Sequence, residues 1–145
     1  WFDPDLHDDL LEQAKSEVRT LAQPIWACDI DQSILEIAKL NANNAGVLQD
    51  IYFKQVAVKD FATDLENGVI IANPPYGKRL KEKKTAEELY VQMGEALSKY
   101  GDFSQYYLVG DPEFEQFFGK TATKKRKLFN GNLRVDFYQY WAKKK

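Results

Sequence analysis

The chain has 145 residues, of which 44% are apolar and 29% are charged, as in an ordinary globular domain. It holds no run of about 18 apolar residues, so we predict no membrane span. A single Cys excludes an intramolecular disulfide and fits a reducing compartment, and one Cys with one His makes a zinc site unexpected. We therefore expect a cytoplasmic protein that uses no metal.

The charge is distributed unevenly along the chain. Residues 1–77 carry 5 Lys/Arg and 13 Asp/Glu, whereas residues 78–145 carry 15 Lys/Arg and 9 Asp/Glu. Such asymmetry hints at a polyanion that binds the basic part. The candidate phosphate contacts are Lys78 and Arg79 in one basic loop and Lys124, Lys125 and Arg126 in a second basic run. Solvated surface charge is the open alternative.

Apolar periodicity and turn residues predict alternating helices and strands. In the first half, Asp3-Pro4 begins a helix, Pro24 ends it, Asp31 caps a second helix and Gly46 stops that one. The expected elements are a helix, a strand, a helix and a strand at residues 4–21, 25–28, 32–45 and 51–58.

The second half continues the alternation. A capping box at residues 85–88 predicts the start of a helix that Gly101 ends, and Asn130-Gly131 predicts the turn of a β-hairpin. The further expected elements are strands at 69–72 and 105–109, a short helix from Asp111-Pro112, and hairpin strands at 127–129 and 133–141. This order implies an α/β fold, a doubly wound and mostly parallel sheet with an antiparallel C-terminal hairpin.

The most informative segment is Asn73-Pro74-Pro75-Tyr76-Gly77, which follows the apolar strand 69–72. Open α/β sheets bind their ligands at the carboxyl ends of strands. The prolines fix the backbone and keep Asn73 extended, so carbonyl groups can face outward. A strand followed by an ordinary Pro-Pro turn is the alternative reading.

This segment suits methylation of an exocyclic or amide nitrogen. The Asn73 side-chain oxygen and the Pro74 carbonyl can accept both hydrogens of an –NH₂ group. Two fixed acceptors would stabilise the positive charge that the nitrogen gains during methyl transfer. Tyr76 offers a flat face on which the target ring stacks. The implied methyl donor is S-adenosylmethionine.

Two acidic residues at strand ends are candidate cofactor ligands. Asp29 follows the strand 25–28, where an acid can bind ribose hydroxyls, and Ile30 can flank an adenine. Asp60 can accept from the adenine amine while Phe61 covers the ring. A helix cap for Asp29 and a loop acid beside a core aromatic for Asp60 and Phe61 are equally open readings.

Nearly the whole chain resembles the C-terminal part of the bacterial THUMP-domain RNA methyltransferases, in particular the 23S rRNA guanine-N2 methyltransferases. The resemblance is carried by residues 29–31, 54–55, 60–61, 73–80, 124–131 and 136–140, and by Ala38, Asn41, Asn43, Ala45, Gly46, Tyr90, Met93 and Gly94. The resemblance implies a Rossmann-like, S-adenosylmethionine-dependent methyltransferase fold and methyl transfer to a guanine of 23S rRNA.

The resemblance also implies roles for individual residues. It places Asp29 on the cofactor ribose, Asp60 near the adenine and Asn73 to Tyr76 on the target base. Taken with the residue patterns above, the expected cofactor-binding residues are Asp29, Ile30, Asp60, Phe61 and Asn73, and the expected catalytic residues are Asn73, Pro74 and Tyr76. Substrate RNA is then expected at Pro75, Gly77, Lys78, Arg79, Lys124, Lys125 and Arg126. Ala27 stands where these proteins often have glycine.

The glycine-rich turn and the THUMP domain of this family are not found in the chain. We therefore expect residues 1–145 to be a partial catalytic domain that lacks the first βα unit and is incomplete as an isolated fragment. The Asn-Pro-Pro-Tyr segment also occurs in adenine-N6 nucleic-acid and glutamine-N5 protein methyltransferases. Those substrates, and a non-catalytic RNA-binding fragment, stay open as alternatives.

Overall fold

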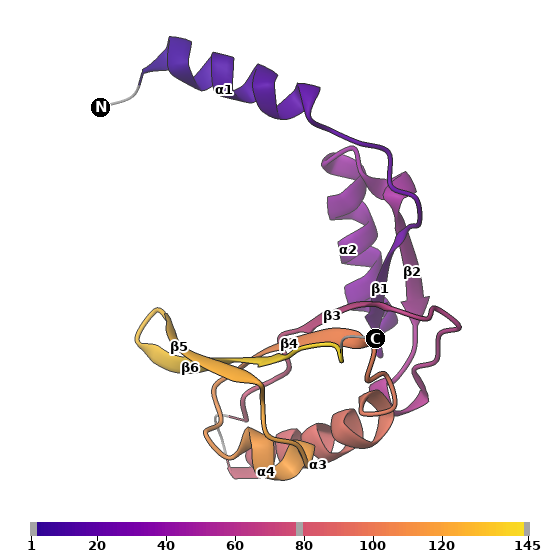
Figure 1. The fold of residues 1–145 in the computed structure, drawn as a ribbon, viewed down its shortest axis with the longest axis vertical. Coiled ribbons are helices and arrows are strands. Elements are labelled where there is room, and N and C mark those ends of the chain that lie inside the picture. The colour runs from indigo at the N-terminus through magenta and orange to yellow at the C-terminus, as the bar shows by residue number, and fades with distance from the viewer. Residues whose placement is uncertain (1–2, 78–79, 144–145) are drawn as a thin grey trace. The chain divides into compact units, whose positions relative to one another are not determined.

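The computed structural model describes residues 3–77 and 80–143, and the chain divides into two compact units, Trp1–Gln55 and Val56–Lys145 (Figure 1). The hydrogen-bonded strands form a two-stranded sheet in the first unit and a four-stranded sheet in the second.

The first unit contains the parallel strands β1 (Ile25–Asp29) and β2 (Ile51–Gln55), with helices α1 (Pro4–Ser16) and α2 (Gln32–Asn44). Asp31 caps α2 as predicted, because its carboxylate accepts from the backbone N–H of Ser33 at 2.8 Å. The buried side chains of α2 are Leu35 and Ala42, and α1 has none.

Two predicted boundaries in this half of the chain are wrong. The helix α1 ends at Ser16 and not at 21, because it buries no side chain and must rely on local propensity, which Val18 and Thr20 lower. The strand β2 ends at Gln55 and not at 58, because its partner β1 ends opposite it at Asp29. Residues Val58–Asp60 form a short 3-10 helix, η2.

In its described residues, the second unit holds four strands and two α-helices besides η2. They are β3 (Gly68–Ala72), α3 (Leu80–Leu97), β4 (Phe103–Val109), α4 (Phe114–Phe118), β5 (Lys124–Asn130) and β6 (Leu133–Tyr140). The sheet order is β3-β4-β6-β5, with β3 parallel to β4 and both β4 and β5 antiparallel to β6. Figure 1 shows α3 and α4 on one side of this sheet.

The core of the second unit is rich in aromatic side chains. Alternate residues of β4 and β6, among them Tyr107, Tyr138 and Tyr140, face Phe114 and Phe118 of α4. The buried amide of Gln105 donates to the carbonyls of Leu97 and Tyr100 at 2.9 and 3.1 Å, which satisfies the carboxyl end of α3. The tight α3–α4 contact needs Gly94, where a Cβ would overlap the carbonyl of Phe118.

The α/β fold, with parallel strands and an antiparallel C-terminal hairpin, is confirmed. The predicted capping box is wrong, since residues 85–88 lie inside α3, which begins at Leu80. Within residues 3–77 and 80–143, no helix combines the length and the apolar character that a membrane span requires.

Candidate functional site

The segment Asn73–Gly77 leaves β3 at its carboxyl end. The register pairs Ala72 of β3 with Tyr107 of β4, so residue 73 and the residues after Val109 leave the sheet at the same edge. Pro74 is buried, Asn73 and Pro75 are exposed, and Tyr76 is half-buried. The prediction that the segment follows a strand is therefore confirmed.

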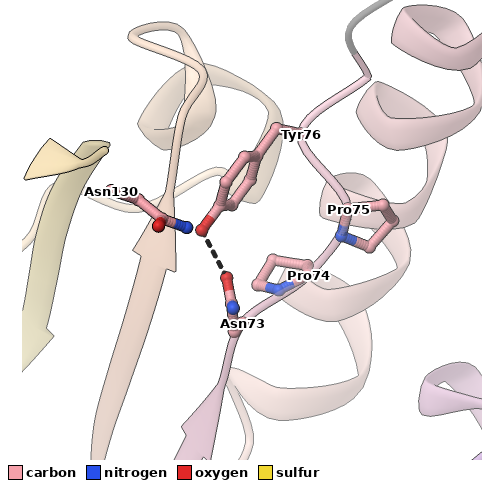
Figure 2. A pocket seen from close by; sticks show the side chains of 5 residues that line it. All are labelled: Asn73, Pro74, Pro75, Tyr76 and Asn130. Atoms are coloured by element: carbon pink, nitrogen blue, oxygen red, sulfur yellow. Dashed lines mark hydrogen bonds between the residues drawn. The ribbon is translucent and has the colours of Figure 1, made fainter. Parts of the chain in front are cut away.

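A hydrogen bond inside the segment orients the candidate catalytic amide. The hydroxyl of Tyr76 donates to the side-chain oxygen of Asn73 at 2.6 Å (Figure 2). A carboxamide oxygen has two lone pairs, so it can accept one more hydrogen from an incoming amine. Tyr76 thus fixes the Asn73 amide as well as offering an aromatic ring.

A second tyrosine holds the backbone of the segment. The hydroxyl of the fully buried Tyr90, on α3, donates to the carbonyl of Pro75 at 2.8 Å. Burial first, and then the charge of Asp111, raise the pKa of Tyr90 to about 12. The hydroxyl therefore stays protonated at neutral pH and keeps its role as donor.

Two glycines make room for this arrangement. A Cβ on Gly110, directly after β4, would lie 3.1 Å from Cγ of Tyr76, so a side chain there would push the ring back by a few tenths of an ångström. Gly77 has φ +63° and lies against α3, where a Cβ would be 2.6 Å from Cα of Lys83. Gly77 is therefore a structural residue of the segment.

The segment lines a shallow, open pocket of about 220 Å³ together with one residue from the hairpin. Asn73, Pro74, Pro75 and Tyr76 form one side, and Asn130 of β5 faces them. Figure 2 shows the amides of Asn73 and Asn130 both directed toward the Tyr76 hydroxyl.

Sequence reasoning missed Asn130 and Tyr90 as site residues. Asn130-Gly131 is a strong turn signal, so its asparagine was assigned to the turn. Tyr90 lies among apolar residues of α3 at helical spacing, which is the pattern of any core position. Both residues are among those that carry the family resemblance, but no local sequence pattern marks either as part of the site.

The two candidate cofactor positions lie in different units. Asp29 ends β1 and accepts from the backbone N–H of Asp31 at 2.8 Å, which fixes one carboxylate oxygen, and Ile30 beside it is 68% exposed. In the second unit, Asp60 is exposed at the end of η2. The half-buried Phe61 packs edge-on against Tyr100, with ring centroids 5.7 Å apart.

The candidate RNA contacts differ in their surroundings. Lys124 and Arg126 are exposed on β5. Lys125, between them, bonds Glu115 at 2.9 Å and lies over the ring of Tyr138, so it is already engaged by the protein. Lys78 and Arg79 lie outside the described residues. Among the described residues, no three acidic, His or Cys side chains gather closely enough to hold a metal ion.

The chain is similar to bacterial proteins with methyltransferase names. It is 51% identical over 140 residues to a Bacillus subtilis protein named "Putative RNA methyltransferase YpsC", covering 93% of this chain and 36% of that protein. It is 35% identical over 137 residues to "Ribosomal RNA large subunit methyltransferase K/L" of Shewanella baltica, covering 91% of this chain and 19% of that protein. The chain thus spans about a third or less of these relatives.

Solved structures agree with this family. A putative methyltransferase named SMU.472, complexed with SAH, superposes with a TM-score of 0.87 at 40% identity, covering 99% of this chain and 38% of that one. A Listeria monocytogenes protein, described as a "predicted N6-adenine-specific DNA methylase", superposes with a TM-score of 0.83 at 40% identity, covering 99% of this chain and 37% of that one. The family model for the RMKL-like methyltransferase domain matches residues 2–139. The chain belongs to the RMKL-like methyltransferase domain family.

Proposed function

We propose that the protein transfers a methyl group from S-adenosylmethionine to the exocyclic N2 amine of a guanine in 23S ribosomal RNA. The observation that carries the proposal is the Asn73–Tyr76 pair, an amide acceptor held at 2.6 Å from a tyrosine hydroxyl at the carboxyl end of β3. The names of the similar proteins, which include a ribosomal RNA methyltransferase, support RNA as the substrate.

The residues fit the proposed cofactor in their chemistry. Asp29 offers a half-buried carboxylate with one oxygen left to accept from ribose hydroxyls, and the exposed Ile30 offers an apolar face for an adenine. Asp60 offers a second, exposed carboxylate. The similar SMU.472 protein is complexed with SAH. We propose that residues 1–145 are the part of the catalytic domain that contributes these groups.

The chain's own residues would act by positioning and by charge stabilisation. When bound, S-adenosylmethionine supplies a methyl carbon, and the electron pair of the broken carbon–sulfur bond stays on sulfur. Asn73 and the Pro74 carbonyl accept the two amine hydrogens while positive charge grows on the nitrogen. The ring of Tyr76 stacks on the target base. One proton then leaves the methylated nitrogen to solvent, so no strong base is required.

The proposal is tested by mass spectrometry of ribosomal RNA nucleosides from a deletion strain. We expect one N2-methylguanine of 23S rRNA to disappear, to return with the complete wild-type protein, and to stay absent with Asn73→Ala. Asn132→Ala, on the exposed hairpin turn outside the pocket, is the control and should restore the methyl group.

Two results would overturn the proposal. The first is an unchanged methylguanine content in the deletion strain. The second is full restoration of the methylguanine by the Asn73→Ala variant. Loss of an N6-methyladenine from the nucleosides, or of an N5-methylglutamine from a digest of cellular protein measured alongside, would support the corresponding alternative substrate, and no change in any of them would support a non-catalytic RNA-binding role.

A further inference from the structure

Asn130 is not needed for the turn of the β5–β6 hairpin. The two turn residues are Gly131 and Asn132, and Gly131 carries the positive φ of +60°. Asn130 pairs with Leu133 as the last rung of the ladder, and its own φ is not positive. An asparagine is therefore not required here by backbone geometry.

The hairpin carries Asn130 beyond the end of its neighbouring strand. The pairing of β4 with β6 stops at Val109 and Asp136, whereas β5 and β6 continue to pair up to Asn130 and Leu133. The last rungs thus project past the carboxyl end of β4, the edge at which Asn73 and Gly110 also leave the sheet.

One hydrogen bond fixes the strand β6 near the residues that project past β4. The hydroxyl of Tyr138 on β6 donates to the carbonyl of Asp111 at 3.2 Å. Asp111 follows Gly110, against which the ring of Tyr76 packs. The strand that carries the hairpin tip is therefore tied to the loop under Tyr76, and the exposed Asn130 lines the pocket opposite Asn73.

We propose that Asn130 is a specificity-determining residue that reads the edge of the target guanine next to the methylated amine. This inference rests on the proposed function. On guanine, the N2 amine adjoins N1–H, a donor, and O6, an acceptor, follows. The carboxamide of Asn130 complements both, since its oxygen accepts from N1–H and its nitrogen donates to O6. The pocket is smaller than the ~300–1,000 Å³ typical of drug-sized ligands, so it suits a single base.

The test compares two RNAs on the same protein. One is the rRNA fragment that contains the target guanine, and the other has 2-aminopurine at that position, which keeps the exocyclic amine but lacks both N1–H and O6. We expect the complete wild-type protein to prefer guanine in kcat/KM, and Asn130→Ala to reduce this preference roughly tenfold or more. Asn132→Ala, on the turn beside it, is the matched control and should keep the preference.

The preference is a ratio measured on one protein sample, so loss of folded protein cancels from it. An unchanged preference in Asn130→Ala, with activity on the guanine RNA measurable, would overturn the role of Asn130 and leave the proposed function intact. Failure of the wild-type protein to methylate the guanine RNA would instead overturn the proposed function itself. Binding of S-adenosylmethionine, followed by calorimetry, should be equal in wild type and variant.

Discussion

At the scale of single residues, the site depends on tyrosine hydroxyls. Tyr76 orients the amide of Asn73, and Tyr90 holds the carbonyl of Pro75 from beneath. Prolines fix φ but leave ψ free, so the direction of the segment's carbonyls also needs an external partner. Tyr90 is that partner, and we regard it as a positioning residue since it has no access to the pocket.

Tyr90→Phe should weaken both stability and catalysis. Loss of one buried hydrogen bond is expected to cost about 1 kcal/mol of unfolding free energy. We also expect a severalfold lower kcat with an unchanged KM for S-adenosylmethionine, because the Pro75 carbonyl, and with it the backbone next to Pro74, would no longer be held. Urea denaturation and steady-state kinetics on the complete protein measure the two effects.

Tyr140→Phe is the matched control for this prediction. Its hydroxyl also donates to a backbone carbonyl, that of Lys120 at 3.0 Å, but it lies outside the pocket. We expect a similar loss of stability and a normal kcat. Equal kcat values in the two variants would show that Tyr90 contributes only to stability.

At the scale of elements, the sequence predicts whether a segment is a helix or a strand better than it predicts where that element begins and ends. The strand before Asn73, the helix cap at Asp31 and the C-terminal hairpin follow from local patterns, and all three are confirmed. The start of α3 does not follow from the local pattern, because the capping box at Thr85 predicts a later start than Leu80, where the helix begins. The hairpin turn is displaced by one residue, since Gly131 takes the first turn position and frees Asn130.

The residues of the candidate site also divide into those that a local sequence pattern identifies and those that it does not. Asn73 and Tyr76 lie three positions apart in one chemically distinctive segment, so that segment can be identified from the sequence. Asn130 and Tyr90 reach the segment through strand register and helix packing, which join residues 15 or more positions apart. Such contacts leave no local pattern to read.

The contact between α3 and α4 predicts a large effect of a small substitution. Gly94→Ala places a methyl group against the Phe118 carbonyl and should cost about 1–3 kcal/mol of unfolding free energy, as overpacking does. Gly101→Ala is the control, because no atom lies within 4 Å of its Cβ and its φ is not positive. Chemical denaturation of both variants measures the difference, and equal stability would contradict the tight contact.

At the scale of the whole molecule, buried tyrosines make stability depend on alkaline pH. Burial raises the pKa values of Tyr90, to about 12, and of Tyr107, Tyr138 and Tyr140 still further. In the unfolded chain these groups titrate near ~10. Their folded-state pKa is raised, so their contribution is complete below pH ~10 and is lost as the pH rises through the folded value.

We therefore expect the free energy of unfolding to fall steeply between about pH 10 and 12. Urea denaturation across this range measures the fall, and absorbance at 295 nm should show Tyr90, Tyr107, Tyr138 and Tyr140 ionising only as the protein unfolds. Tyr90→Phe should reduce the slope of the fall. Ionisation of all tyrosines near pH 10 in the folded protein would contradict this prediction.

The projection of the β5–β6 rungs past β4 has a consequence for substitutions there. Residue 130 is exposed and its rung has no partner in β4, so changing it should barely affect the stability of the sheet. Tyr90, which holds the segment Asn73–Gly77 in place, belongs by contrast to the packed core. If Asn130 selects the target base as proposed, substitution at the hairpin tip would alter that selection while leaving the packed core and the fold as they are.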